Sequence, residues 1–407
     1  MKKIINDPVH GFITVNSERV MEVIDHPYFQ RLRRIKQLGL TEMVYPGALH
    51  TRFHHALGAM HLMNMAMGTL CDRGHSISSQ QCEAAMLAIL LHDVGHGPFS
   101  HALEKSILTG VSHEQVSLFI MQRMARELGG PLALSERMFS GTYPRPFFNY
   151  LVSSQLDCDR LDYLKRDCFF TGVLEGAIGA GRLIKMLDLV DEQVVVEEKG
   201  IYSVENFLNS RRVMYWQVYL HKTTVCAEEM LIRLIRRARQ LIAAGERVYT
   251  PEWLGFFFTY EVTLHDFETD PDVLEYFMLL DDNDIWQCIK CWMRHPDLIL
   301  SRLATALWER RLFRVRLQPE APAPDWQHRA ERRLMAKYGI SRDETEYFLI
   351  QGTVSNAAYL QDAPPINIKM RTGQVIELTE ASDLPHIAAM AQLVKKHYIC
   401  WPKEIDL

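Results

Sequence analysis

The sequence lacks any apolar run long enough to cross a membrane. Its clearest apolar stretch, Ala84–Leu91, is much shorter than the roughly 20 residues that a membrane helix needs. The N-terminal residues include two lysines but no apolar stretch behind them, so they do not resemble a secretory signal. We therefore expect a cytoplasmic protein that has no membrane partner.

Paired cysteines are also scarce. The eight cysteines are scattered along the chain, and only Cys288 and Cys291 lie close together. A zinc ribbon needs a second pair at a matching spacing, and the sequence has none. Without a secretory signal, the expected state of these thiols is reduced.

The chain has no excess of basic residues. Its 45 Lys and Arg residues are outnumbered by 50 Asp and Glu residues, which gives a formal net charge of −5. This balance provides no global cationic field, so nucleic acid is not indicated as a partner. Hydrophobic residues make up 48% of the chain, which is enough for a large core and excludes a disordered or fibrous protein.

Helical periodicity dominates the sequence and predicts a mainly α fold. The apolar residues recur at helical spacing in five segments, which are Met60–Leu70, Gln81–Asp93, His113–Leu128, Glu205–Leu241 and Ile299–Leu317. Two hairpins are expected, one from residues 193–198 and 201–204, the other from residues 366–370 and 375–378. We predict a helical body over residues 1–320 and a smaller α+β region over residues 321–407.

Histidine is abundant near the N-terminus. Of 17 histidines, 11 lie within the first 113 residues. A lone histidine on a helix is usually a surface or hydrogen-bonded side chain, and we interpret five of them in this way. These five are His10, His26, His61, His75 and His265.

His92 and Asp93 stand together at the end of an apolar helix, directly before a Gly-His-Gly-Pro stretch breaks it. A buried imidazole and carboxylate at that place cost desolvation free energy unless something satisfies both. A divalent cation does so, because imidazole nitrogen and carboxylate oxygen suit Zn, Fe, Mn, Ni or Mg. His55 is a candidate third ligand, and an acid from residues 157–163 is a candidate fourth.

The motifs resemble those of the HD-domain metal-dependent phosphohydrolases, in particular the deoxynucleoside-triphosphate triphosphohydrolase branch. The signature is His55, the pair His92 and Asp93, and Asp159, and the wider match covers residues 1–225. The resemblance implies that these four residues bind one divalent metal ion. It also implies hydrolysis of dNTPs to the deoxynucleoside and inorganic triphosphate, with a second Mg carried by the nucleotide.

The resemblance further implies which residues serve the chemistry. His101 corresponds to the histidine that acts at the α-phosphate, as general acid or nucleophile, and Glu104 and His113 correspond to its supporting relay. Glu104 stands where a vertebrate member has a shorter aspartate. His96 corresponds to a histidine that contacts phosphate.

One helical face is expected to join the metal to the sugar. Asp159, Tyr163 and Asp167 are spaced i, i+4, i+8, so they project from one side of a helix. The resemblance implies that Tyr163 and Asp167 hold the 3′-hydroxyl, while Gln37 and Leu38 pack against the sugar.

The remaining substrate contacts implied by the resemblance involve the triphosphate and the base. Arg52, Arg160 and Arg211 would contact the triphosphate, and the guanidinium fork suits phosphate. Tyr219 would lie beneath the base, and Tyr215 would be part of the pocket.

Nucleotide activation and a homo-oligomer, either a dimer or a tetramer, are further implications. The matching residues for an activating GTP or dNTP fall in two groups, Lys3, Asn6, Asp25, Gln30 and Arg33, then Arg182, Lys199, His221 and Lys222. Glu197 stands where a vertebrate member has an arginine, and an acid there would repel phosphate. The alternative is that these residues only fold the N-terminal part of the chain.

Two other functions stay open on the sequence alone. An HD phosphohydrolase for a nucleoside monophosphate or a cyclic dinucleotide would not need an extended row of triphosphate-binding cations. A nucleotide-sensing or nucleic-acid-binding scaffold would use basic surfaces at residues 233–239 and 310–316, although such runs are usually solvated.

Overall fold

Helices make up most of the molecule, which confirms the predicted fold class. The computed structural model describes residues 2–99, 104, 106–108, 110–359, 363–384, 387 and 390–406. Within this part of the chain, no helix is both long and apolar enough to cross a bilayer.

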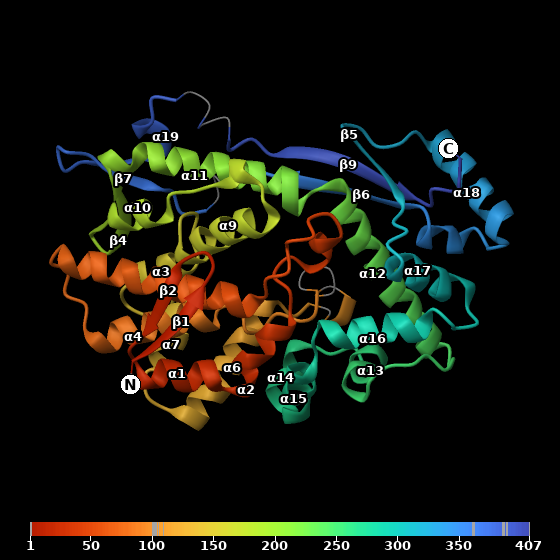
Figure 1. The fold of residues 1–407 in the computed structure, drawn as a ribbon, viewed down its shortest axis with the longest axis horizontal. Helices are drawn as coiled ribbons and strands as arrows, with labels where there is room; N and C mark the ends of the chain where they lie inside the picture. The colour runs from red at the N-terminus through yellow and green to blue at the C-terminus, as the bar shows by residue number, and fades with distance from the viewer. Residues whose placement is uncertain are drawn as a thin grey trace.

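A helical body formed by the first half of the chain occupies one side of the molecule (Figure 1). In it, α3 packs against α4 and α9, α4 packs against α7, and α7 packs against α6. The bounds of its helices are α1 Glu18–Asp25, α2 Pro27–Gln30, α3 Arg52–Asp72, α4 Ser79–Leu91, α6 His113–Leu128, α7 Leu132–Phe139, α8 Phe147–Val152, α9 Cys158–Thr171 and α10 Ala180–Lys185.

Side-chain caps explain where the helices of the site begin. Ser78 and Ser112 accept backbone N–H groups at the starts of α4 and α6, each within a reciprocal capping box. Asp157 caps α9 in a similar way by accepting from the backbone N–H of Arg160. The helices predicted over 60–70, 81–93 and 113–128 are therefore confirmed, and α4 ends at Leu91, directly before His92.

The helix predicted over residues 205–241 is interrupted. It consists of α11 (Ile201–Met214), a π-helical turn η5 (Tyr215–Tyr219) and α12 (Lys222–Ala243). His221 has extended backbone and its Nδ1 accepts from the N–H of Thr223, so it starts a new helix. The π turn falls on the two tyrosines expected in the nucleotide pocket, and π turns are common at functional sites.

The hairpin predicted from residues 193–198 and 201–204 is wrong in its second strand. β4 (Gln193–Glu197) pairs with the preceding strand β3 (Leu187–Val190). The two residues between them, Asp191 and Glu192, both have positive φ, as a tight two-residue hairpin requires. Residues 201–204 instead open α11.

The C-terminal part of the chain adds strands to two sheets. The predicted hairpin of residues 366–378 is confirmed as β7 (Asn367–Lys369) and β8 (Val375–Glu377), and β7 pairs in parallel with β4. A second sheet has the order β5-β9-β6, formed by Arg314–Gln318, Val394–Trp401 and Ile350–Asn356. Strands on the two sides of residue 320 therefore pair with each other.

The helix predicted over residues 299–317 is wrong from residue 309 onwards. α17 (Leu298–Trp308) ends before Arg310, whose φ of 54° lies in the left-handed region. Beyond it, apolar and basic residues alternate in β5, which pairs with β9.

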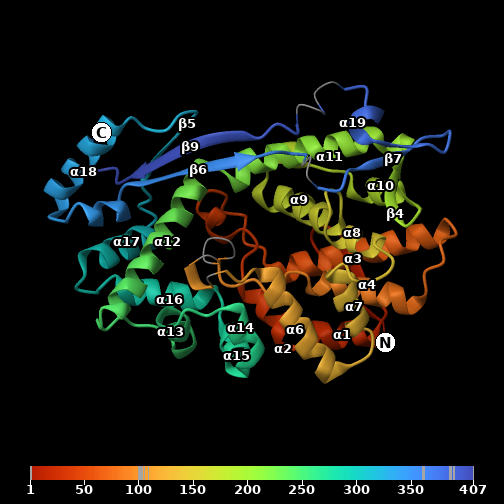
Figure 2. The ribbon, with the colours of Figure 1, turned by 180° about the vertical axis from the view of Figure 1, so that it is seen from behind.

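The other half of the molecule is reached through α12, which runs across to the remaining helices (Figures 1 and 2). α12 packs against α13 and α17, and α16 packs against α17. The bounds of the further helices in this half are α13 Glu252–Thr259, α14 Leu264–Thr269, α15 Pro271–Leu279, α16 Asp282–Trp292 and α18 Pro324–Tyr338. The short helix α19 (Leu378–Ala381) lies instead on the side of the helical body, where it contacts β7 and β8 (Figure 1).

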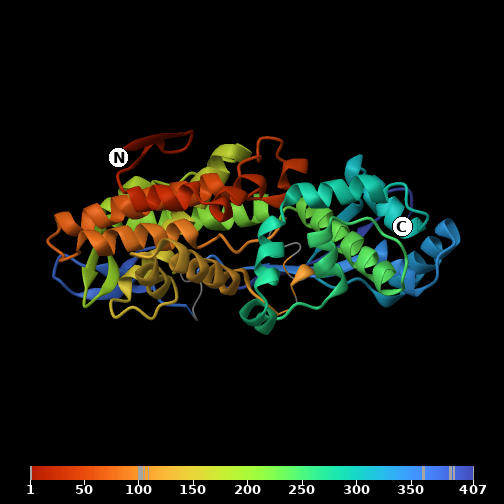
Figure 3. The ribbon, with the colours of Figure 1, turned by 90° about the horizontal axis from the view of Figure 1, so that it is seen from below.

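An N-terminal hairpin, which the sequence analysis did not predict, lies on the outside of the helical body (Figure 3). β1 (Lys3–Asp7) pairs antiparallel with β2 (Gly11–Val15), and β2 contacts α3. Ile13 and Val15 of β2 are buried, so the inner face of the hairpin is part of the core.

Candidate metal centre and active site

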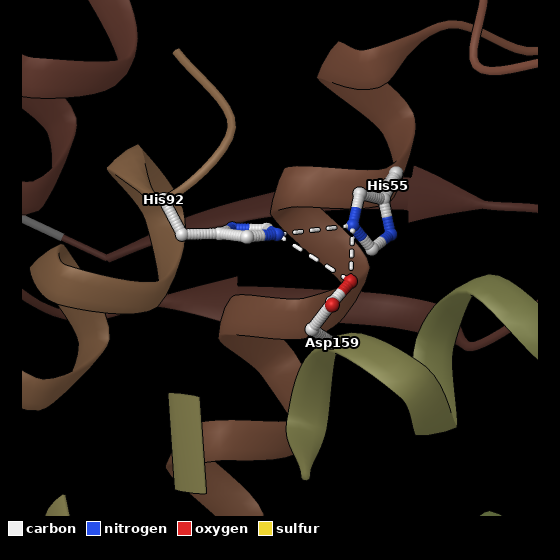
Figure 4. Close-up of side chains that lie close together, drawn as sticks. All are labelled: His55, His92 and Asp159. Carbon is white, nitrogen blue, oxygen red and sulfur yellow. Dashed lines mark hydrogen bonds and ion pairs between the residues drawn. The ribbon is translucent and has the colours of Figure 1, made fainter. Parts of the chain in front are cut away.

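Three helices bring His55, His92 and Asp159 together at one point (Figure 4). His55 comes from α3, His92 follows α4, and Asp159 lies in the first turn of α9. The Oδ1 of Asp159 is 3.1 Å from the Nε2 of His55 and 3.4 Å from the Nε2 of His92. The two Nε2 atoms are 3.4 Å apart.

The hydrogen bonds made by the Nδ1 atoms determine the tautomer of both imidazole rings. The Nδ1 of His55 donates to the Oδ2 of Asp162 at 2.8 Å, and the Nδ1 of His92 donates to the carbonyl of Ile89 at 2.6 Å. In the neutral rings, both Nε2 atoms therefore carry lone pairs. Those lone pairs face each other and the carboxylate of Asp159.

A divalent cation fits this arrangement. Metal–ligand distances of about 2.1 Å place neighbouring ligand atoms about 3.0 Å apart in an octahedral site and about 3.4 Å apart in a tetrahedral site. The three separations of 3.1–3.4 Å lie in that range. The donor set contains nitrogen and oxygen but no sulfur, which leaves the identity of the metal open.

The pKa values of the ligand residues also indicate that a positive charge is favoured at this site. Burial lowers the pKa of His55, but hydrogen bonds with Asp159 and Asp162 outweigh it and raise this pKa to about 10. Burial raises the pKa of Asp159, but His55 and His92 more than offset this and hold it below its usual range. A proton or a metal ion would each satisfy this demand.

Asp93, the fourth predicted ligand, lies beside the ligand triangle that is formed by His55, His92 and Asp159. Its Oδ1 is 3.4 Å from the Nε2 of His92 and 3.3 Å from the Nε2 of His96, and its Oδ2 accepts from the Nη1 of Arg52. Burial raises the pKa of Asp93, but His92, Arg52 and His96 hold it well below its usual range. Arg52, expected at the triphosphate, thus pairs with a predicted metal ligand.

The loop after His92 sits against the start of α6 because Gly95 has no side chain. A Cβ on Gly95 would lie 2.2 Å from the carbonyl oxygen of His113 and 2.4 Å from the backbone nitrogen of Ser117. The N–H of Gly95 donates to the Oγ of Ser117, which donates to the carbonyl of His92. This packing fixes the loop next to His113.

The predicted relay is assembled at that contact. The Oε1 of Glu104 accepts from the Nδ1 of His113 at 3.0 Å and from its backbone N–H at 2.9 Å. The ring of His113 stacks on that of His96, with centroids 3.8 Å apart. Burial and the charge of Arg52 lower the pKa of His96 well below its usual value, so this ring is neutral. His101, the predicted acid or nucleophile, lies outside the described residues.

Asp167 and the tyrosines form a second group one to two turns further along α9. The Oδ2 of Asp167 accepts from the hydroxyl of Tyr219, and its Oδ1 accepts from the Nε2 of His50, each at 2.7 Å. The ring of Tyr163 lies 6.1 Å from that of Tyr219 and 6.4 Å from that of His55. The predicted wall of Asp159, Tyr163 and Asp167 is therefore present.

The two other predicted triphosphate arginines are held by neighbouring groups. Arg160 pairs with Asp157, the cap of its own helix. The Nη1 of Arg211 donates to the carbonyl of Ala358 at 3.2 Å, and its guanidinium lies over the ring of Tyr215.

The segment with Gln37 runs beside the start of α3. The backbone N–H of Gln37 donates to the carbonyl of His50, and that of Arg52 donates to Ile35. Leu38 packs against the core. Three buried atoms of predicted site residues, and one of the neighbouring His50, have no hydrogen-bond partner in the described part of the chain, and a polar ligand could provide one. These atoms are Gln37 Oε1, His50 Nδ1, Arg160 Nε and Arg211 Nε.

A buried acid from α16 joins the two sides of the site. The Oδ1 of Asp282 accepts from the N–H of Phe99 at 2.8 Å, and its Oδ2 accepts from the N–H of Lys36 at 2.9 Å. Burial raises the pKa of Asp282 to about 6. The carboxylate therefore connects the loop after His92 with the segment that carries Gln37.

Comparisons with known proteins agree with this geometry. The family model for the HD domain matches residues 52–140, and the model for the HD associated region matches residues 178–248. A solved phosphohydrolase from Bacteroides thetaiotaomicron is 46% identical, with a TM-score of 0.95, and the match covers 98% of this chain and 100% of that one. The chain belongs to the HD-domain phosphohydrolases.

Other relatives of this HD-domain phosphohydrolase range from near full-length to partial matches. The protein YwfO of Bacillus subtilis is 31% identical over 99% of this chain and 93% of its own length. A deoxynucleoside triphosphate triphosphohydrolase of Homo sapiens is 28% identical over 61% of this chain. The chain spans 47% of the length of that human protein.

The first group of predicted activator residues in this phosphohydrolase makes local contacts. Lys3, Asn6 and Asp25 are exposed. The Nε of Arg33 donates to the Oε1 of Gln30 at 2.7 Å, and the Nε2 of Gln30 donates to the carbonyl of Ile24.

Residues of the second group also have partners within the chain, and Lys199 contacts the acid Glu197. Arg182 donates to the carbonyl of Lys199, His221 caps α12, and Lys222 is exposed at the start of that helix. Glu197 accepts from Arg73 at 2.6 Å and contacts Lys199 at 2.7 Å, and the Arg73 hydrogen bond lowers the pKa of Glu197 to about 2. Positive charge at Lys199 is thus already compensated.

Several groups that hold the site were given no role in the sequence analysis. Asp162 and Arg166 stand in the same segment as Asp159, which the family resemblance assigned as the ligand, and the i, i+4, i+8 spacing from Asp159 passes over both of them. His10 was interpreted as ordinary, and its partner Asp162 is 152 residues away in sequence. Local patterns carry no signal for such distant pairs.

Proposed function

We propose that this phosphohydrolase cleaves dNTPs to the deoxynucleoside and inorganic triphosphate, with one divalent metal ion at the HD site and a second Mg bound to the nucleotide. The observation that carries the proposal is the position of Asp167 two turns from Asp159 on α9. Each oxygen of Asp167 accepts one hydrogen bond, from Tyr219 or His50, and retains a lone pair for a sugar hydroxyl. The similarity to deoxynucleoside triphosphate triphosphohydrolases of Dictyostelium discoideum and Homo sapiens adds support.

The residues divide the work in the proposed reaction. A divalent ion held by His55, His92, Asp93 and Asp159 would neutralise phosphate oxygens and acidify a bound water. Arg52, Arg160 and Arg211 would stabilise charge on the triphosphate. Tyr163 and Asp167 would hold the 3′-hydroxyl, Gln37 and Leu38 would contact the sugar, and Tyr215 and Tyr219 would line the base.

Proton transfer is assigned to the histidines after His92. Glu104 accepts from the Nδ1 of His113, so the Nε2 of His113 carries the lone pair in the neutral ring. His96, stacked on His113, would contact phosphate. In the proposal His101 protonates the departing 5′-oxygen, a role that rests on the family resemblance.

A product assay tests this function. Purified protein is incubated with each dNTP in the presence of Mg, Mn, Fe or Zn, with and without GTP, and the products are separated by anion exchange. We expect deoxynucleoside and inorganic triphosphate in equal amounts. Monophosphate and pyrophosphate as the only products would contradict the proposal. The GTP arm tests activation, and light scattering after gel filtration tests the proposed homo-oligomer.

The smaller-substrate alternative makes a different demand on Arg211. If the substrate is a triphosphate, Arg211→Ala should lower kcat/KM by about 10- to 100-fold, since a charged hydrogen bond is lost. Nearly unchanged turnover would favour a monophosphate or cyclic dinucleotide.

A nucleic-acid-binding scaffold receives little support. Within the basic runs, Arg236 pairs with Glu346 at 2.9 Å, Arg237 with Asp297 at 2.6 Å, and Arg311 with Glu309 at 2.8 Å. These acids compensate much of the charge that phosphate binding would need.

A further inference from the structure

The turn of the N-terminal hairpin reaches into the helical body with two polar side chains. Asp7, at the end of β1, accepts from the backbone N–H groups of Val9 and His10 and so closes the turn. Its carboxylate also accepts from Arg166 on α9, at 2.8 Å for Oδ2 and 3.3 Å for Oδ1. The Nε2 of His10 donates to the Oδ1 of Asp162 at 2.7 Å.

Asp162 is the point where these contacts meet. Its side chain is fully buried and accepts four hydrogen bonds, from His10, from the Nε and Nη2 of Arg166, and from the Nδ1 of His55. Because Asp162 is a carboxylate that accepts each of these hydrogen bonds, it holds His55 as the Nδ1–H tautomer. The Nε2 lone pair of His55 is then directed at His92 and Asp159.

The backbone of α3 is shaped to admit this network. Gly58 lies one turn beyond His55, and a Cβ there would be 2.0 Å from the Oδ1 of Asp162 and 2.2 Å from the Nη2 of Arg166. The absence of a side chain at residue 58 therefore lets the buried acid and its arginine lie directly against the helix that carries the metal ligand.

We propose that the β1–β2 hairpin is a positioning element of the metal centre, in which His10 and Asp7 hold Asp162 and Arg166 so that His55 presents its Nε2 to the ion. The hairpin lies outside both segments that match the HD family models. The inference rests on the proposed metal site and not on the identity of the substrate.

Manganese binding by the full chain, stripped with a chelator, tests the inference without any substrate. Free Mn²⁺ is followed by electron paramagnetic resonance during titration of the wild type and of His10→Leu, His10→Gln and Asp7→Asn. The control is His75→Leu, because His75 also donates its Nε2 to a carboxylate oxygen, that of Asp188, at 2.7 Å but beyond the other end of α3. Circular dichroism and the Tm of the metal-free proteins check folding.

We expect His10→Leu to weaken Mn²⁺ binding by about 10- to 100-fold, since loss of a group that orients a metal-bound histidine typically has this effect. His10→Gln retains an N–H donor and should bind close to the wild type. Asp7→Asn should weaken Mn²⁺ binding less than His10→Leu does. If His10→Leu does not fold, the Mn²⁺ affinity of Asp7→Asn tests the positioning role instead. His75→Leu should leave binding unchanged.

Wild-type affinity in His10→Leu and Asp7→Asn, or an equal loss in His75→Leu, would overturn the positioning role while leaving the metal site intact. A wild type that binds no Mn²⁺, or other divalent ion added in its place, would instead overturn the metal site itself. The two failures are therefore distinguishable.

Discussion

At the scale of single residues, the metal centre depends on the Nδ1 protons of its two histidines, which are donated to groups outside the centre. His55 and His92 donate from Nδ1 to Asp162 and Ile89, so both Nε2 lone pairs are available on the inside. The three inner atoms lie so close together that a positive charge between them is required. Substitution of a metal-ligating residue should therefore reduce the amount of bound metal more than it reduces the stability of the fold.

His92→Ala is expected to reduce bound metal to background and hydrolysis by at least about 1000-fold, because the ion loses one of its nitrogen ligands. Elemental analysis of the purified variant and the product assay measure the two effects. His265→Ala, a change at an exposed position on α14, is the control. Undiminished hydrolysis in His92→Ala would refute the metal site.

Two glycines of α3 allow a matched test of its close packing. Gly58→Ala places a Cβ against Asp162 and Arg166, so we expect the free energy of unfolding to fall by about 1–3 kcal/mol and metal affinity to fall with it. Gly68→Ala meets no atom within 4 Å and should stabilise the helix by about 0.5–1 kcal/mol. Urea denaturation measures both, and equal effects at the two positions would contradict the packing argument.

The sequence predicted the residues of the site better than their partners. His55, His92, Asp93 and Asp159 could be recognised because they fall in short motifs, and Tyr163 and Asp167 because helical spacing places them with Asp159. His50 and Asp282 were missed because their partners lie 117 and 183 residues away in sequence. A contact of that kind exists only once the helices have packed.

At the scale of elements, the loop after α4 is held from outside the HD region. Asp282 at the start of α16 accepts from Phe99 of this loop and from Lys36 of the neighbouring segment. Phe99 has a φ of 51°, in the left-handed region that a bulky residue rarely adopts, so the loop needs such support.

Asp282→Asn should lower kcat while metal affinity is retained. The amide has one acceptor oxygen for two N–H donors, so one of them loses its partner and the free energy of unfolding falls by about 1–3 kcal/mol. Asp284→Asn is a matched control, because Asp284 lies in the same helix and accepts from Asp281 and Trp253. If Asp284→Asn lowers kcat as much as Asp282→Asn does, the loop has no special dependence on Asp282.

Elements were predictable where the signal is local. α6 matches its predicted bounds because Ser112 and Gln115 form a capping box at its start. The turn at Asp191 and Glu192 was missed because neither residue is a glycine, asparagine or proline, and the strand end of the 299–317 segment was missed because its partner β9 comes much later in the chain. No local sequence pattern predicts that β9 lies between β5 and β6 in the second sheet.

At the scale of the whole molecule, the C-terminal strands are fastened to the helical body by polar contacts. Asp188 in β3 accepts from His75 and from Lys369 in β7, both at 2.7 Å. Burial raises the pKa of Asp188, but these two partners outweigh it and lower it from an ordinary value of 3.8 to about 2.

The stability contributed by Asp188 should therefore depend on pH. Because its pKa is lower in the folded state, the contribution is present above about pH 4 and is lost as the pH falls towards 2. We expect Asp188→Asn to lower the free energy of unfolding by about 1–2 kcal/mol at pH 7, with a smaller deficit at pH 3. Urea denaturation at several pH values measures this. Asp72→Asn, with the same charge change at an exposed position, is the control, and a deficit independent of pH would contradict the assignment.

The contact between Arg211 and the carbonyl of Ala358 has a consequence for protein synthesis. The four predicted metal ligands and the acids behind them have all been made once residue 167 leaves the ribosome, whereas residue 358 follows roughly 10–40 s later at 5–20 residues per second. We therefore expect each nascent chain to be able to capture its metal ion while the segment that contacts Arg211 is still missing. During that interval Arg211 lacks the carbonyl that holds it in the complete structure.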